Sequence, residues 1–220
     1  MTKTLGGVLG PVVTTFDEVT GELAALPFRA NVRAHLDAGL TGVIVAGSTG
    51  EAALLEEHER HRLLEWTRAV VPDDRWLIAG VGAESTRLTI RRAREAAERG
   101  ADAVLVVAPH YYGAQMTPEA LAAHFRHVAD ESPLPIILYN IPKYVHFALA
   151  PGLVQELATH GSERESERDR RQDQVLHVLP IPAPGAGAAG TGADRGQPVE
   201  LHREDDDHHH AEPVVRHRDA

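Results

Sequence analysis

The chain has 220 residues, a formal net charge of −10 and no cysteine. The negative charge argues against nucleic acid and anionic membranes as partners, because both are bound by basic surfaces. The lack of cysteine excludes disulfides, a thiolate nucleophile and cysteine-ligated zinc. Since no apolar run approaches the roughly 18 residues that a membrane span needs, we expect a soluble, cytoplasmic protein.

Residues 5–161 alternate between strand-like and helix-like segments. We interpret the first apolar run, residues 8–16, as a strand and not as part of a signal peptide, because glycines and a proline interrupt it and no small-residue cleavage site follows. Periodicity predicts the remaining elements. The strands are expected at 41–47, 76–82, 101–109 and 135–140, and the helices at 28–39, 57–71, 85–100, from 117 onward, and at 150–161.

Two of these helices carry clear start signals. Ser85 is a good N-cap residue, and Thr117 followed by Pro118 supplies an N-cap and a proline at the first helical position. Gly39 and Gly100 are suited to helix ends, because glycine readily adopts the left-handed conformation found there.

Continuous apolar strands alternating with amphipathic helices indicate an α/β fold with a parallel sheet covered by helices. Each unit takes about 30 residues, which suits a (β/α)₈ barrel or an open doubly wound sheet. The pattern alone leaves both open, although no G-x-G-x-x-G follows the first strand, which disfavours a dinucleotide-binding fold.

The sequence changes character at residue 162. A charged block, a Pro/Gly/Ala-rich stretch and an acidic and histidine-rich tract follow, and no Phe, Trp or Tyr occurs after Phe147. Such a segment buries too little apolar surface to offset its ordering entropy. We therefore predict a folded domain over residues 1–161 and a disordered, low-complexity tail over 162–220.

Polar residues gather where three predicted strands end, and in parallel α/β folds those ends meet at one edge. The three segments are Gly47-Ser48-Thr49-Gly50-Glu51, Pro109-His110-Tyr111-Tyr112 and Tyr139-Asn140-Ile141-Pro142. Hydroxyls that converge in this way suggest carboxylate binding and proton transfer. Taken singly, each segment is also explained as an ordinary turn, or as aromatic side chains that cap the end of the barrel.

Together, the motifs G-S-T-G-E, P-x-Y-Y and L-Y-N-I-P resemble the dihydrodipicolinate synthase / N-acetylneuraminate lyase family over residues 5–161. The resemblance implies a class I aldolase on a (β/α)₈ TIM barrel, here about five β/α units, that acts on pyruvate or a related 2-keto acid. It implies that Thr49, helped by Ser48, binds the substrate carboxylate and that Tyr139 shuttles protons. Tyr111 corresponds to the tyrosine that enters a neighbouring subunit's proton relay in a dimeric or tetrameric assembly. No cofactor and no metal site are predicted.

The chain departs from the family at its reactive amine. A class I aldolase forms a Schiff base through a lysine, which in this family lies on strand six. Only Lys3 and Lys143 occur in the chain, and neither lies there. We therefore predict an inactive chain, truncated or frameshifted after about residue 161. A one-nucleotide shift through the codons for residues 168–172 is able to restore Val-Ile-Gly-Val-Lys, a hypothesis that the coding DNA tests.

A second departure concerns the substrate. Dihydrodipicolinate synthases usually carry an arginine two residues after the proline of L-Y-N-I-P, where this chain has Tyr144. This argues against dihydrodipicolinate formation and leaves other 2-keto acid aldolases or lyases, unless Tyr144 merely packs over the rim. Two further alternatives are a non-catalytic keto-acid-binding relic and a truncated barrel with open edges at strands one and five. A metal-dependent aldolase is a weaker alternative, and His58 and His61 are interpreted as solvated.

Overall fold

The computed structural model describes residues 5–168 and 177–178. The chain divides into two units, residues 1–182 and 183–220, and all described residues lie in the first. Most of the predicted disordered tail therefore lies outside the described residues. Within this predicted tail the structure describes residues 162–168, which continue a helix, and residues 177–178, which form a strand.

The first unit contains one parallel sheet whose strands follow their order in the chain, β1-β2-β3-β4-β5-β6. All five neighbouring pairs are parallel. The strands are β1 (Leu9–Pro11), β2 (Gly42–Val45), β3 (Trp76–Gly80), β4 (Ala103–Val107), β5 (Ile136–Tyr139) and β6 (His177–Val178). This unbroken order is that of a (β/α) barrel, because a doubly wound sheet reverses its strand order at the middle.

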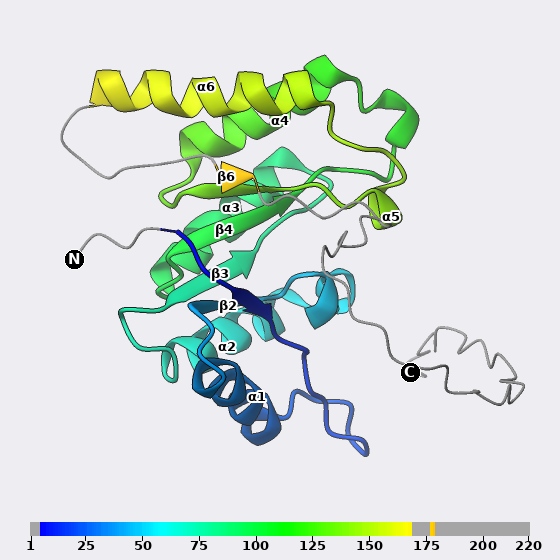
Figure 1. The fold of residues 1–220 in the computed structure, drawn as a ribbon. Coiled ribbons are helices and arrows are strands. Elements are labelled where there is room, and N and C mark those ends of the chain that lie inside the picture. Colours follow the sequence, from blue (N-terminus) through cyan, green and yellow to red (C-terminus); the bar gives the residue numbers. More distant parts are fainter. Residues whose placement is uncertain (1–4, 169–176, 179–220) are drawn as a thin grey trace, which may run out of the picture. The chain divides into compact units, whose positions relative to one another are not determined.

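Helices connect the strands and pack against one another in sequence, α1 on α2, α2 on α3, α3 on α4 and α4 on α6. Figure 1 shows α1 and α2 beside the first strands and α4 and α6 beside the later ones. The α-helices are α1 (Ala25–Asp37), α2 (Glu57–Arg68), α3 (Thr86–Glu98), α4 (Pro118–Glu131), α5 (Pro142–Val145) and α6 (Pro151–Arg168). Three 3₁₀ turns complete the set, at Ser48–Gly50, Ala52–Leu54 and Gly113–Gln115.

The predicted start signals are confirmed. The Ser85 hydroxyl accepts a hydrogen bond from the amide of Leu88 at 3.2 Å, and that of Thr117 accepts one from Ala120 at 3.2 Å. Pro118 occupies the first turn of α4. These bonds satisfy amides that the helices leave unpaired at their starts.

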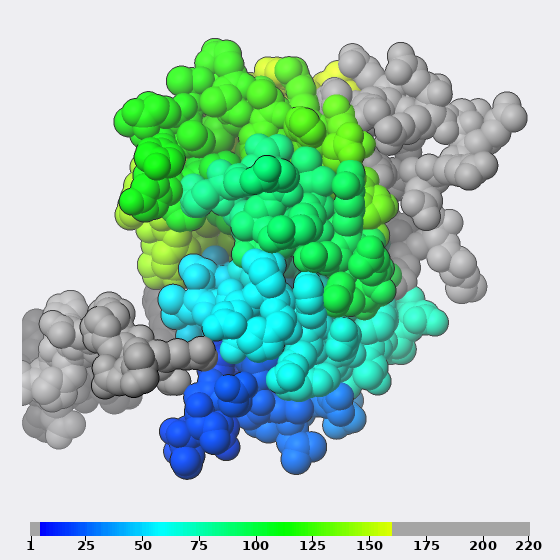
Figure 2. Space-filling view, turned by 180° about the vertical axis from the view of Figure 1, so that it is seen from behind, coloured from blue at the N-terminus to red at the C-terminus, as the bar shows by residue number. Residues whose placement is uncertain are grey.

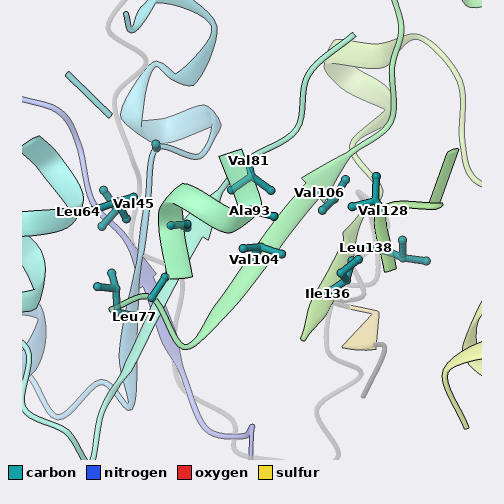
Figure 3. Close-up of a cluster of buried hydrophobic side chains, with 14 of the residues drawn as sticks. Val45, Leu64, Leu77, Val81, Ala93, Val104, Val106, Val128, Ile136 and Leu138 are labelled. Atoms are coloured by element: carbon teal, nitrogen blue, oxygen red, sulfur yellow. The ribbon is translucent and has the colours of Figure 1, made fainter. Parts of the chain in front are cut away.

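The two faces of the sheet bury different sets of side chains, because successive residues of a strand point to opposite sides. One face packs against the helices, and Figure 3 shows part of this core. Its labelled residues are Val45, Leu64, Leu77, Val81, Ala93, Val104, Val106, Val128, Ile136 and Leu138. The opposite face gathers Ile78, Ala103, Leu105 and Ile137, against which Ile44 and Tyr139 pack. The fold is therefore a parallel sheet with its helices on one side, an open part of a TIM barrel.

Four features differ from the expectation. The first strand is shorter than predicted, and Phe16 instead pairs with Leu23 in an isolated antiparallel bridge. The short helix α5, which begins at Pro142, was not predicted, although proline is well suited to a first helical turn. Helix α6 runs on through Arg168, past the boundary predicted at residue 161. The fifth strand is not an open edge, because Ile137 and Leu138 pair with β6.

Candidate functional site

The carboxyl ends of β2, β4 and β5 all lie at one edge of the sheet, because the strands are parallel and sequential. This confirms that the three polar segments predicted from the sequence share one edge. Tyr139 is the last residue of β5 and its register partner is Val107, the last residue of β4. The sheet thus brings the exits of β4 and β5 side by side.

The segment after β2 forms a tight double turn. The amides of Gly50 and Ala52 both donate to the carbonyl of Gly47, at 3.0 and 3.2 Å. From the segment after β1, the buried Thr14 hydroxyl donates to the carbonyl of Gly50 at 2.7 Å. Ala46, at φ 53°, and Glu51, at φ 57°, hold left-handed conformations that a non-glycine residue adopts only when its surroundings enforce them.

This turn leaves Ser48 and Thr49 exposed at its outer side. Among the described residues, their amides make no hydrogen bond within the turn, whose internal bonds use Gly50, Glu51 and Ala52 as donors. Within the described part of the chain, two hydroxyls and two amides therefore have no partner and can donate to a ligand. Grouped donors of this kind suit a carboxylate, since successive backbone amides and hydroxyls donate to its oxygens.

Tyr139 is half-buried on the sheet face opposite the helices, next to the apolar side chains of Ile137 and Leu105. Its hydroxyl has no hydrogen-bond partner within the part of the chain that the structure describes. The next residue, Asn140, accepts a hydrogen bond from the amide of Leu149 at 3.1 Å and so fastens the strand exit to the segment before α6. The side chain of Tyr139 is held in place by packing while its polar end remains available.

The segment after β4 carries two exposed tyrosines. Tyr111 is 77% exposed and Tyr112 is 67% exposed, and their rings meet edge to face with centroids 4.9 Å apart. A tyrosine this exposed contributes little to its own chain's core. Tyr111 therefore lies at the edge of the sheet where β4 and β5 end, and among the described residues its hydroxyl makes no hydrogen bond to Tyr139.

Glu84 holds the Tyr111 segment, and it was missed in the sequence. Its Oε2 accepts hydrogen bonds from the amides of His110 and Tyr111, both at 2.9 Å. Its Oε1 lies 3.1 Å from Nδ1 of His110. A glutamate in the loop after β3 thus fixes the backbone of the loop after β4. No local pattern signals this role, because the partners are backbone groups of a distant segment.

A charged network supports the site from the helix side. Buried Arg60 donates from Nη1 to the carbonyl of Gly80 at 3.3 Å and from Nη2 to that of Ala52, joining the end of β3 to the turn after β2. Arg92 pairs with Glu57 through Nε at 3.0 Å and donates to the carbonyl of Gly82 at 2.9 Å. Burial, followed by the proximity of Arg92, lowers the pKa of Arg60 to about 10, so that it remains a cation at neutral pH.

The remaining candidates have ordinary surroundings. His58 lies 3.2 Å from Glu56, and His61 lies 3.1 Å from Glu95. Across residues 5–168 and 177–178, no three His, Cys, Asp or Glu side chains cluster as a metal site. None of the described helices is both long and apolar enough to cross a membrane. Tyr144 is 50% exposed in α5, with the amine of Lys143 5.3 Å from its ring centre.

A sequential parallel sheet with helices on one side and polar groups at the strand exits defines the (β/α)-barrel class of enzyme folds. Residues 4–162 match the model of the dihydrodipicolinate synthetase family. The chain belongs to this family, whose members are lyases of the aldolase type.

Individual relatives agree with this assignment. A 4-hydroxy-tetrahydrodipicolinate synthase from an Exiguobacterium species is 37% identical over 154 residues, 70% of this chain and 52% of the relative. The 4-hydroxy-tetrahydrodipicolinate synthase structure from Methylacidiphilum fumariolicum SolV superposes with a TM-score of 0.67 at 28% identity, covering 71% of this chain and 51% of the other.

A family member with a bound ligand is also similar. The prophage protein YagE from E. coli K12, solved in complex with pyruvate, superposes with a TM-score of 0.65 at 31% identity, covering 70% of this chain and 50% of YagE. The chain spans about half the length of the curated relatives it matches.

Proposed function

We propose that residues 5–161 are related to C–C lyases of the Schiff-base type and form their keto-acid-binding part. We propose further that this chain binds a pyruvate-like 2-keto acid without forming the covalent intermediate. The observation that carries the proposal is the open donor group of Ser48 and Thr49 at the same sheet edge as Tyr139. A small keto acid needs a carboxylate site and a nearby proton donor, and this edge offers both.

The lineage chemistry starts with a lysine amine, which condenses with the keto carbonyl and expels water. The resulting iminium withdraws electrons from the adjacent carbon, so that a C–C bond there forms or breaks. In this scheme the carboxylate lies against Ser48 and Thr49, and Tyr139 delivers and accepts protons at the reacting carbon. Tyr111 completes the relay from a neighbouring subunit, which its high exposure supports.

The absence of a suitable amine supports a binding role for this chain. Its lysines are Lys3 and Lys143, and the strand that follows α6 consists of His177 and Val178. Lys143 lies in α5 beyond the strand exit, with its amine beside the ring of Tyr144. Lys143, the lysine that the structure describes, therefore does not occupy a strand position from which it faces the substrate carbonyl.

The expected ligand is a 2-keto acid with a short chain. Pyruvate is bound by the relative YagE, and the Ser48–Thr49 turn offers donors for a single carboxylate. Tyr144 stands where an arginine for a second substrate's carboxylate is expected, so we propose an acceptor other than the one used in dihydrodipicolinate formation.

The test combines binding and covalent trapping on the full chain. Saturation-transfer NMR is expected to detect pyruvate, and to detect the 2-hydroxy acid lactate much more weakly. Incubation with pyruvate and borohydride, followed by intact-mass analysis, is expected to leave the mass unchanged. An irreversible adduct contradicts the non-covalent role, and equal signals from pyruvate and lactate contradict recognition of the keto acid.

A further inference from the structure

A groove of about 810 Å³ separates α3 from α4 on the helical side of the sheet. Figure 2 looks onto this side, where the residues of α2, α3 and α4 follow one another from cyan to green. The groove is lined by Thr86, Arg87, Ile90, Arg91, Arg94, Ala120, Ala123, His124, His127 and Glu131. Its size is typical of sites for small molecules.

The lining is cationic although the chain as a whole is acidic. Arg87, Arg91 and Arg94 come from one face of α3, because residues four and three apart lie above one another on a helix. Glu131 pairs with Arg94 at the far end of the groove. Among the described residues, Arg91 makes one ion pair, a long contact of 3.9 Å with Glu95 of its own helix, and it also helps to lower the pKa of Glu57.

Arg87 is the free cation of the three. It is exposed, and it makes no ion pair with any residue that the structure describes. It lies in the first turn of α3, where the helix dipole places partial positive charge. Both α3 and α4 contribute residues of their first turns, Thr86 and Ala120, to the same end of the groove. Arg87 and the two helix starts thus add positive charge at this end, opposed by the carboxylate of Glu84, which acts electrostatically on His124.

A buried imidazole at the same end lacks a partner. His124 is 6% exposed, and its Nδ1 lies 2.8 Å from the hydroxyl oxygen of Thr86. Its Nε2 is buried and has no hydrogen-bond partner. If the Thr86 hydroxyl donates to Nδ1, the proton of the neutral ring is on Nε2 and is unsatisfied. A buried donor without an acceptor costs about 1–3 kcal/mol.

We propose that the groove between α3 and α4 is a binding site for a small molecule bearing a phosphoryl group. Arg87 and Arg91 would bind the phosphoryl oxygens through their planar forks, which suit this geometry. A small movement of His124 would bring its Nε2 proton to the same group. A dianion matches two incompletely neutralised arginines better than a single carboxylate does. The site is separate from the keto-acid site at the strand exits.

The test measures binding of inorganic phosphate to the full chain by calorimetry at low ionic strength. We expect saturation at one site, at least about tenfold weaker in a variant carrying Arg87→Gln and Arg91→Gln. Arg33→Gln is the matched control, since Arg33 is an exposed helical arginine on α1. Equal affinity in the double variant, the same loss in the control, or no saturation in the parent chain each overturns the proposal.

A second readout reports on the histidine without any substitution. Phosphate is expected to shift the ¹⁵N resonance of His124 Nε2, whereas pyruvate is not. Phosphate binding that leaves this resonance unchanged contradicts the assigned site. Loss of the pyruvate signal with phosphate binding intact contradicts only the keto-acid proposal, so the two fail independently.

Discussion

The carboxylate of Glu84 holds the backbone of Tyr111, because its Oε2 accepts the Tyr111 amide at 2.9 Å and the neighbouring His110 amide at the same distance. The loop after β3 thereby determines the position of the loop after β4. Since Tyr111 is exposed and without support from its own core, this carboxylate is its principal attachment.

Replacing Glu84 by alanine is expected to free the Tyr111 segment. Amide hydrogen exchange at His110 and Tyr111 should accelerate about tenfold, because hydrogen bonds to a charged acceptor are among the stronger ones. Glu18→Ala, which changes an exposed glutamate elsewhere, serves as the control. Unchanged exchange at both amides shows that Glu84 does not hold the loop.

Thr49→Val is expected to weaken pyruvate binding about tenfold while preserving the melting temperature, because it removes one hydroxyl donor from an exposed position. NMR titration measures the affinity. Thr159→Val is the matched control, since that hydroxyl bonds only to Gln155 of its own helix at 3.0 Å. Equal losses in the two variants argue against a carboxylate site at the β2 turn.

Arg60→Met should lower the free energy of unfolding by about 1–3 kcal/mol, because the carbonyls of Gly80 and Ala52 lose their buried donor. Urea denaturation measures the change. Arg62→Met, at an exposed position of the same helix, is expected to have little effect. An Arg60→Met variant with an unchanged free energy of unfolding indicates that the turn after β2 is held by other contacts.

His124 makes stability depend on pH. Burial lowers its pKa from 6.5 to about 4, with Glu84 opposing the shift and His127 adding to it. Since the unfolded chain binds the proton first, stability is fully present above pH 6.5 and declines as pH falls toward 4. The loss attributable to this group approaches about 3 kcal/mol.

The pH effect is measured by urea denaturation at several pH values. His124→Gln should flatten the profile between pH 6.5 and 4, whereas His127→Gln, at an exposed position, should preserve it. Parallel profiles for the parent chain and the His124 variant contradict this assignment.

Gly80→Ala should destabilise the protein and disturb the Ser48–Thr49 turn. An added Cβ would lie 2.0 Å from the carbonyl oxygen of Ala46, which already has a left-handed conformation. In contrast, a Cβ at Gly152 meets nothing within 4 Å, so Gly152→Ala should be neutral or slightly stabilising. Thermal melts compare the Gly80→Ala and Gly152→Ala variants. Similar melting temperatures would contradict the close approach of Gly80 to the Ala46 carbonyl.

Much of the fold was predictable because its signals are local. Ser85 and Thr117 act as caps within one helical turn, and the strand exits follow from the apolar runs themselves. The periodicity alone left barrel and doubly wound sheet open, since strand order is a property of tertiary packing, and the barrel was predicted from the resemblance of the three strand-exit motifs to a known family. Strand β6 was missed because its two residues lie in a short apolar run, residues 175–179, between a charged block and a Pro/Gly/Ala-rich stretch that were interpreted together as one disordered tail.

The candidate site was predictable only in part. The Ser48–Thr49 turn and Tyr139 were predicted because hydroxyl-bearing residues follow apolar strands directly, and the structure places both at the same edge of the sheet. Glu84 and His124 were missed, since one acts on the backbone of a segment 26 residues away and the other is an unremarkable position in a helix. Roles that depend on distant partners leave no mark in local periodicity.

Successive side chains of β4 point to opposite faces of the sheet and therefore have different partners. Val104 and Val106 pack with the helices, whereas Ala103 and Leu105 line the face shared with Tyr139. Neighbouring residues of the strand are therefore under different constraints. One set must pack against the helices, whereas the other faces the side of the sheet that carries Tyr139 and would contact a ligand. Related proteins can therefore differ at every second residue of a strand, and so in the molecule that they bind, while the packing of the sheet against its helices stays the same.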